Sequence, residues 1–323
     1  MKDAVVGVDI GGTFTKFGII DRLGNVLLEG SVPTDQTDDV DVYLAGLTGA
    51  VDKAIKELIQ SVSIKGVGIG APCSNFKSGS IEFAANLPWA HDKVIPLVAL
   101  LQEHFQMPVA VTNDANAAAI GEMIYGGAKG MKDFILITLG TGLGSGIVVN
   151  GEVLYGHNGF AGELGHIRVK NHDGRLCGCG LSGCVETYVS APGIKRTVFE
   201  LLAKYNGNSE LTKYSFDQLD SEMIYHAATR GDKIALEAFQ ITGEILGVKL
   251  ADAVHITAPE KIFLFGGLAK SGDYILKPTR ESFEKNVLSL WQGKVPIELS
   301  QLAESNVAIL GASALIWQEL NRQ

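Results

Sequence analysis

A dense set of metal-ligating side chains lies in the stretch ELGHIRVKNHDGRLCGCGLSGCVE, from Glu163 to Glu186. Three of the four cysteines of the chain fall within it, and thiolates combined with an imidazole are usual donors of structural zinc. Glycines between the cysteines allow a tight loop to wrap an ion. We therefore predict a closed tetrahedral zinc site whose ligands are His166, Cys177, Cys179 and Cys184. His172 lies in the same loop and is an alternative imidazole ligand.

Two glycine-rich turns follow short apolar strands, and both have the composition of phosphate-binding loops. The first is DIGGTFTK, from Asp9 to Lys16, and the second is LGTGLGSG, from Leu139 to Gly146. Glycines leave backbone N–H groups open to an anion, a threonine adds a hydroxyl donor, and a carboxylate holds Mg²⁺ through its water shell. Neither turn has the Walker or dinucleotide pattern. The expected contacts to phosphates or Mg²⁺ are Asp9, Gly11, Gly12, Thr13, Lys16, Gly140, Thr141 and Gly142.

A third constellation is Asn113-Asp114, at the junction between a predicted strand and the helix that NDANAAAIGE opens. A carboxylate there can take the proton of an alcohol during phosphoryl transfer. Asn and Asp are also favoured helix caps, so this motif alone leaves both interpretations open. The metal loop adds Glu163, His166 and Glu186. Polar groups held rigidly in this way are suited to bind several hydroxyls of one sugar.

Composition limits the classes of protein to consider. A chain of 323 residues with 46% hydrophobic residues has the length of two domains. The formal charge of -9 argues against nucleic acid as a partner, because its backbone needs a basic face. Clustered free cysteines suit a reducing compartment, and the N-terminus MKDAVVGVDIGG fits neither a signal peptide nor a membrane span. We expect a cytoplasmic protein with no membrane partner.

Apolar runs of strand length alternate with helical patterns, which predicts an α/β fold. The segment FILITLGTGLGSGIVVNGEVLYG repeats the strand, glycine turn and strand of the N-terminus. Two related halves that face one cleft are therefore expected. The predicted strands are residues 4–10, 15–20, 26–32, 66–70 and 108–112 and the segment KIFLFGG, and the predicted helices include residues 40–61, 233–258 and about 306–321.

Five motifs, in chain order, carry a resemblance to a known family: DIGGTFTKFG, NDANAAAIGE, LGTGLGSGIVVNG, NGFAGELGH and CGCGLSGCVETYVS. Together they resemble the ROK family of repressors, open reading frames and sugar kinases. The resemblance implies the two-domain actin-like ATPase (ribonuclease H-like) fold with a structural zinc loop, closing on ATP and a hexose, and a homodimer. The domains implied are residues 1–113 plus about 306–323, and residues 114–305.

The resemblance also implies a role for individual residues. Asp114 is the catalytic base and contacts the substrate, and His166 both ligates zinc and binds sugar. Gly266 and Gly267 lie near the nucleoside. The implied cofactors are ATP, Mg²⁺ and structural Zn²⁺. The other sugar-binding residues are Asn86, in a segment similar to the sugar-specificity region of the family, and Asn113, Glu163 and Glu186.

The implied function is ATP-dependent phosphorylation of a hexose at its 6-hydroxyl, as in glycolysis, with glucose the first choice. N-acetylglucosamine, N-acetylmannosamine, mannose and fructose stay open as acceptors. A sugar-sensing regulator is the non-enzyme alternative, but only eight residues precede Asp9, so we expect no DNA-binding domain there. We expect the zinc to support sugar binding, with the glycine turns lying elsewhere. Two departures from the family are Phe14 in the first turn, which affects only a peripheral nucleotide contact, and Ser145 in the second turn, acceptable if its φ is negative. Cys73, where glycine is usual, is expected to be buried.

Overall fold

A computed structural model describes residues 1–170, 172–205, 209–302 and 307–322. The chain forms two compact units, each assembled from separate segments. Unit 1 comprises Met1–Met131, Val153–Ala161 and Gln301–Gln323, and unit 2 comprises Lys132–Glu152 and Gly162–Ser300. The domain boundaries expected from the sequence stay a prediction, and positions 306 and 323 lie outside the described residues.

Unit 1 is built on a sheet with the strand order β3-β2-β1-β4-β8. β1, β2 and β3 form an antiparallel meander, whereas β4 and β8 run parallel to β1. All five strands overlap the ranges predicted from sequence. Their bounds are β1 Lys2–Ile10, β2 Phe14–Asp21, β3 Val26–Pro33, β4 Val62–Gly70 and β8 Val109–Thr112.

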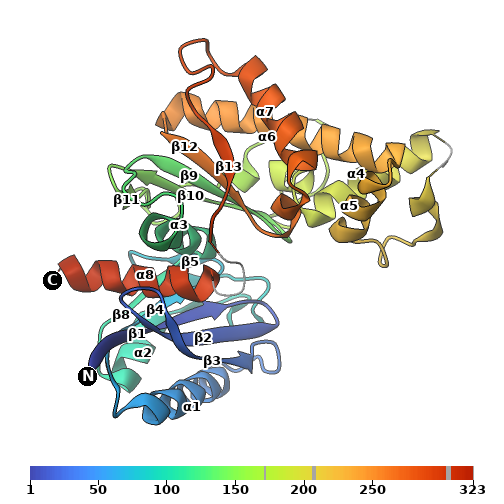
Figure 1. The fold of residues 1–323 in the computed structure, drawn as a ribbon. Helices are drawn as coiled ribbons and strands as arrows, with labels where there is room; N and C mark the ends of the chain where they lie inside the picture. Colours follow the sequence, from blue (N-terminus) through green and yellow to red (C-terminus); the bar gives the residue numbers. More distant parts are fainter. Residues whose placement is uncertain (171, 206–208, 303–306, 323) are drawn as a thin grey trace. The chain divides into compact units, whose positions relative to one another are not determined.

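Helices cover both faces of this sheet, because successive side chains of a strand point to opposite sides. On β1, the side chains of Ala4, Val6, Val8 and Ile10 share a core with α1 (Val40–Leu58). The opposite face meets α8 (Val307–Arg322), so closely that a side chain at Gly7 would clash with the carbonyl of Ile309. Figure 1 shows α1 and α8 on the two sides of the sheet.

Unit 2 repeats the same arrangement with the order β11-β10-β9-β12-β13. β9 and β10 form an antiparallel hairpin, β12 runs parallel to β9, and β13 runs parallel to β12. The matching strand orders confirm the two related halves that the repeated glycine turn predicted. The bounds are β9 Phe134–Leu139, β10 Leu143–Val149, β11 Glu152–Val153, β12 Lys261–Phe265 and β13 Ile297–Leu299.

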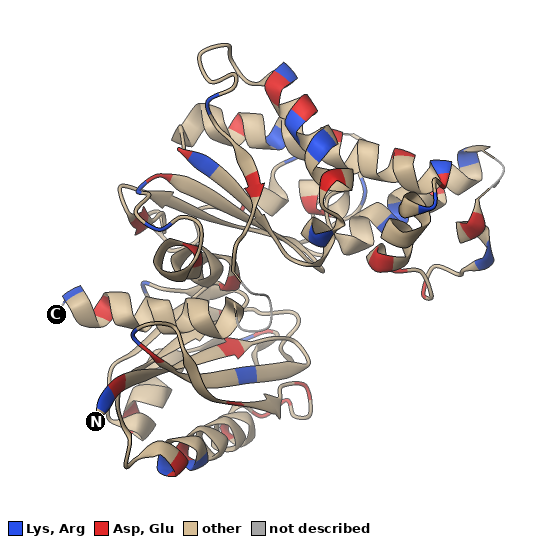
Figure 2. Ribbon diagram, in the orientation of Figure 1, with Lys and Arg blue, Asp and Glu red and all other residues tan. Residues whose placement is uncertain are grey.

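One face of the unit 2 sheet packs against a group of helices. Inward side chains of β9, such as Ile135 and Ile137, join a core with α4, α6 and α7. The carboxylate of Asp232 caps α6 by accepting from the N–H groups of Ile234 and Ala235, each at 3.0 Å. The helices are α4 Ala191–Tyr205, α5 Ser221–Thr229, α6 Lys233–Thr257 and α7 Asp273–Asn286. Figure 2 shows basic and acidic residues interspersed along α7.

Smaller elements complete the chain. A three-stranded sheet in unit 1 consists of β5 (Ser74–Asn75), β6 (Ser80–Glu82) and β7 (Val94–Ile95). The remaining elements are α2 Leu97–Phe105, α3 Asp114–Tyr125 and the 3₁₀ turns η1 Pro88–Ala90, η2 Leu164–His166, η3 Val185–Thr187, η4 Glu210–Lys213 and η5 Gly267–Ser271. Within the described residues, no helix combines the length and apolar character needed to cross a bilayer.

Candidate functional site

In unit 1, the predicted phosphate and base residues lie at one edge of the sheet. β1, β4 and β8 are neighbouring parallel strands, so their carboxyl ends meet there, which is where open α/β sheets bind ligands. Gly11 and Gly12 follow β1, and Asn113 with Asp114 follows β8. A side chain at Gly70, the last residue of β4, would contact the Cα of Asp114 at 3.9 Å. The fold thus brings together two motifs about a hundred residues apart in sequence.

At this edge, the charge of one carboxylate shifts the pKa of another. Burial is the main cause that raises the pKa of Asp9 to about 6, and the negative charge of Asp114 raises it further, against the lowering effect of Lys16. Asp9 and Lys16 are directly paired across the β1–β2 hairpin. Desolvation also raises the pKa of Asp114, although backbone hydrogen bonds oppose it. Asp114 keeps exposed surface, so a ligand can reach a carboxyl whose proton affinity is enhanced.

The first glycine turn leaves donors free for an anion. The N–H of Gly11 is used within the turn, where it donates to the carbonyl of Phe14 at 3.2 Å. The N–H groups of Gly12 and Thr13 make no hydrogen bond within the described part of the chain. Asn86 lies beside this turn, since a side chain at Gly12 would be 3.4 Å from its carbonyl oxygen. The exposed Asn86 side chain is thus at the same edge as Asp9.

Asn113 and Asp114 also serve as helix caps. The side-chain oxygen of Asn113 accepts from the N–H of Ala115 at 2.9 Å, and Oδ1 of Asp114 accepts from the same N–H at 2.7 Å. The helix-cap interpretation of this motif is confirmed, and the role of Asp114 as a base stays a prediction. The second carboxylate oxygen of Asp114 remains available to a substrate, because capping uses only Oδ1.

In unit 2, the second turn and the GG pair meet in the corresponding way. β9 and β12 are parallel neighbours, so the turn Gly140–Gly142 and the pair Gly266-Gly267 lie at the same edge. Gly266 has φ +101, and a side chain there would lie 2.6 Å from the carbonyl oxygen of Leu139. Only glycine meets both conditions. The N–H groups of Thr141 and Gly142 make no hydrogen bond within the residues described.

The predicted zinc ligands converge. The ligand atoms of His166, Cys177, Cys179 and Cys184 all lie within 4.8 Å of one another. Sγ of Cys179 is 3.7 Å from Sγ of Cys184, which is too long for a disulfide and matches the ~3.8 Å between sulfurs of a tetrahedron with Zn–S of about 2.3 Å. A tight turn orients the thiols, with the N–H of Gly180 donating to the carbonyl of Cys177 at 3.0 Å. The donor set and its spacing fit zinc.

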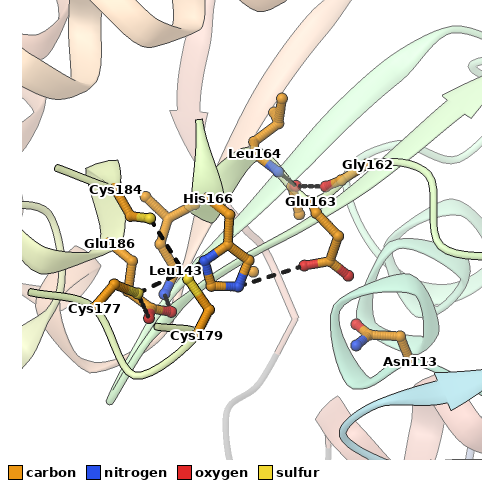
Figure 3. A network of polar contacts seen from close by, with 12 residues as sticks. Asn113, Leu143, Gly162, Glu163, Leu164, His166, Cys177, Cys179, Cys184 and Glu186 are labelled. Carbon is orange, nitrogen blue, oxygen red and sulfur yellow. Dashed lines mark hydrogen bonds and ion pairs between the residues drawn. The ribbon is translucent and has the colours of Figure 1, made fainter. Parts of the chain in front are cut away.

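One nitrogen of the His166 imidazole faces the cysteine cluster, and the other nitrogen faces a carboxylate. Nδ1 lies 3.8 Å from Sγ of Cys177, and Nε2 lies 4.0 Å from a carboxylate oxygen of Glu163. A metal-bound histidine commonly turns its second nitrogen toward such a partner. Figure 3 shows His166 between the cysteines and Glu163. His172 is exposed and, among the described residues, is not part of the cluster.

Glu186 lies on the other side of the cluster, against the second turn. Its Oε2 accepts from the N–H of Leu143 at 3.0 Å, and its Oε1 is 3.6 Å from Sγ of Cys177. Oε2 of this predicted sugar-binding residue is therefore already engaged by the protein, whereas a zinc-bound Cys177 thiolate has no proton to donate to Oε1 (Figure 3). Each carboxylate oxygen can accept a second hydrogen bond, so a sugar hydroxyl is still a compatible partner.

Ser145, which the sequence marked only as a departure from the family, contacts the backbone on both sides of Glu163. Ser145 lies in β10, and its φ is not positive. This meets the condition under which serine is acceptable in the second turn. Its buried hydroxyl donates to the carbonyl of Gly162 and accepts from the N–H of Leu164 at 3.3 Å. These two backbone groups flank Glu163. A hydroxyl at an inward position of an apolar strand was the signal that could have revealed this role.

Cys73 differs from the expectation of a small buried side chain. It is exposed, and its φ of +52 places it in the left-handed region. That region favours glycine, which explains why a glycine is suited to this position. Nearby Asn75 is held by its own contacts, because its amide group donates to Glu82 and to the carbonyl of Asn158, each at 3.0 Å.

Comparisons with known proteins agree with these features. The ROK family model matches residues 5–319. A glucokinase from Halalkalibacterium halodurans is 36% identical, over 98% of this chain and 96% of its own length. A crystal structure of a ROK family glucokinase from Streptomyces griseus, in complex with glucose and AMPPNP, matches with a TM-score of 0.79 and 33% identity, covering 98% of this chain and 99% of that chain. A xylose repressor from Caldicellulosiruptor bescii is 28% identical, over 98% of this chain and 79% of its own length. The α/β fold of the actin-like ATPase class is thereby confirmed.

Proposed function

Because this chain belongs to the ROK family, we propose that it is an ATP-dependent hexose kinase that phosphorylates the 6-hydroxyl of its sugar. Glucose is the first candidate acceptor, since relatives over nearly the whole chain are glucokinases. We also propose that the protein acts in the cytoplasm, in the first step of sugar breakdown, and as a homodimer.

Asp114 is the base of the proposed reaction. As the sugar oxygen attacks the γ-phosphorus, its proton passes to the carboxylate, and the bond from phosphorus to the β-phosphate oxygen breaks. The carboxyl is anchored through Oδ1 to the start of α3. Desolvation raises its pKa, which strengthens it as a proton acceptor. General-base catalysis of this kind contributes on the order of 10² to 10⁴ in rate.

The two glycine turns supply the phosphate contacts. Free N–H groups at Gly12, Thr13, Thr141 and Gly142 are preorganised donors for phosphate oxygens, so they stabilise charge without reorganisation. Asp9 would hold Mg²⁺ through coordinated water, and that ion, when bound, neutralises phosphate charge. The pair Gly266-Gly267 borders the nucleoside in this proposal.

The residues that we propose for sugar recognition are Asn86, Asn113, Asp114, Glu163, His166 and Glu186. Carboxylates and amides accept from or donate to ring hydroxyls, and a site of this kind rejects an epimer because its own polar groups are then left unpaired. His166, Cys177, Cys179 and Cys184 would hold zinc as a closed structural ion, which orders the loop and takes no part in the chemistry.

The observation that supports this proposal most directly is the position of Asp114 beside the first glycine turn. A base and a phosphate loop at the same carboxyl edge of one sheet is the arrangement that phosphoryl transfer to an alcohol requires. The relationship to a xylose repressor favours a second candidate, a sugar-binding regulator without kinase activity. The two functions differ in turnover and not in sugar binding.

A coupled assay that measures ADP formation, run with glucose, mannose, fructose, N-acetylglucosamine and N-acetylmannosamine, tests the proposal. We expect glucose to give the highest kcat/KM. Asp114→Asn keeps the size of the side chain but removes the proton acceptor, so kcat should fall at least 10²-fold while glucose binding by calorimetry changes little. Sugar binding without turnover for every hexose would instead identify a regulator.

A further inference from the structure

Glu186 links the metal loop to the second glycine turn. Its Oε2 accepts from the N–H of Leu143 at 3.0 Å, and Leu143 directly follows the turn Gly140–Gly142. The same carboxylate occupies the space that a side chain at Gly142 would need. The expectation that the glycine turns lie away from the metal loop is therefore wrong for the second turn (Figure 3).

The backbone that carries Glu186 is fixed by the metal ligand Cys184. The carbonyl of this fully buried cysteine accepts from both the N–H and the hydroxyl of Thr187, at 3.1 and 2.7 Å. The N–H of Val185 donates to the carbonyl of Ile167 at 2.9 Å, which ties the same turn to the neighbour of His166. The direction of the Glu186 side chain thus depends on both arms of the metal loop.

The remaining contacts of the second turn leave its phosphate donors free. The N–H of Gly140 donates to the carbonyl of Gly142 at 3.0 Å, and the carbonyl of Gly140 accepts from the N–H of Ala191 at 2.9 Å. The turn therefore rests on the segment 186–191, with Glu186 at one end and Ala191 at the other. Losing the Glu186 contact would leave the N–H of Leu143 unpaired and one side of the turn unsupported.

We propose that Glu186 is a positioning residue for the nucleotide. It holds the second glycine turn in the form that binds phosphate, so that the affinity for nucleotide depends on the integrity of the metal loop. This inference rests on the proposed function, in which that turn binds ATP. Arg175 holds the start of α4 separately, donating to the carbonyls of Thr187 and Gly193 at 2.8 and 2.9 Å. Because these Arg175 contacts do not involve the Glu186 side chain, the effect of substituting Glu186 is confined to the turn.

Nucleotide binding in the absence of sugar provides the test, measured on the zinc-loaded full chain as the Kd of a fluorescent nonhydrolysable ATP analogue. Glu186→Ala removes the acceptor for Leu143 and should raise this Kd on the order of tenfold. Glu186→Gln keeps a side-chain oxygen at the same place, so its Kd should stay within about twofold of wild type.

Glu163→Ala is the matched control. Glu163 belongs to the same loop and is also assigned to sugar, but its carboxylate faces His166 at 4.0 Å. This variant should weaken glucose binding and leave the nucleotide Kd unchanged. A second arm removes the metal from wild type with a chelator, which should raise the nucleotide Kd about as much as Glu186→Ala does. Chelation of the Glu186→Ala variant should raise its nucleotide Kd little further, because both changes act through one contact.

Each of these measurements either supports or overturns the positioning role of Glu186. A wild-type nucleotide Kd in Glu186→Ala, with glucose binding weakened, would overturn the positioning role and leave the proposed function standing. The positioning role is also overturned if chelation weakens nucleotide binding in Glu186→Ala by as much as it does in wild type. Should Glu186→Ala fail to fold, an unchanged nucleotide Kd in chelated wild type would overturn it. Absence of nucleotide binding in untreated wild type would refute the proposed function itself, and this inference with it.

Discussion

Replacing Asp9 by asparagine should stabilise the protein at neutral pH while it impairs the proposed activity. Burial and the charge of Asp114 raise the pKa of Asp9 from 3.8 to about 6 in the folded state. Between these values the folded chain retains a proton that the unfolded chain has released. The free energy of unfolding therefore falls as the pH rises through this window, and the loss is complete above about pH 6.

The magnitude follows from the shift. A difference of about two pKa units corresponds to about 3 kcal/mol above pH 6, and to roughly half of that at pH 5. Asparagine does not titrate, so Asp9→Asn should be more stable than wild type by up to ~3 kcal/mol at pH 7.5, with a smaller gain at pH 5. Its proposed Mg²⁺ contact is lost, so phosphorylation should fall.

Urea unfolding followed by tryptophan fluorescence measures this difference, because Trp89 and Trp317 are both buried in unit 1. Asp3→Asn is the control on the same strand. Asp3 is exposed and pairs with Lys65 at 3.2 Å, a surface contact of little value, so its removal should change stability only slightly. If Asp9→Asn is no more stable than wild type at pH 7.5, or if its gain does not grow between pH 5 and 7.5, the assignment of a raised pKa is wrong.

Three further outcomes are expected. Cys179→Ser should lower the zinc content measured by metal analysis and raise the glucose KM at least tenfold, and a zinc-free protein with normal KM would contradict a supporting role of the metal. Ser145→Ala should raise the glucose KM several-fold with little change in nucleotide Kd, because its hydroxyl holds the backbone on both sides of Glu163; equal losses for both ligands would argue against this. Gly142→Ala should weaken nucleotide binding by displacing the Glu186 carboxylate, and an unaltered Kd would show that the turn tolerates the displacement.

Features that depend on near neighbours in sequence were predictable. The Cys-Gly-Cys spacing and the intervening glycines shape the metal turn locally, and the ligands converge as expected. Strand, glycine turn and strand at both Asp9 and Leu139 predicted two hairpins, which the matching sheet orders confirm. Local hydrogen bonding and alternating side-chain direction act over a few residues, so the pattern of residues is sufficient to recognise them.

Helix α7 could not be predicted from its local sequence. No helix was predicted over Asp273–Asn286, and Pro278 inside it lacks the N–H that a helix interior uses. The helix forms because it packs along α6, so closely that a side chain at Gly243 would meet the ring of Pro278 at 2.6 Å. Burial against α6 offsets the cost of the proline, and that contact joins segments that the sequence does not show to be neighbours.

The chemistry of the site was decided partly by the sequence and partly by the tertiary structure. Residue type alone identified Asp9, Asp114 and Glu186 as carboxylates suited to metal, proton or hydroxyl. Only the fold places Asp9 near enough to Asp114 for one charge to shift the pKa of the other, and turns Glu186 toward Leu143. Coulomb energy and hydrogen bonding depend on distances of a few ångströms. Those distances join residues far apart in the chain, so they exist only once the sheets have formed.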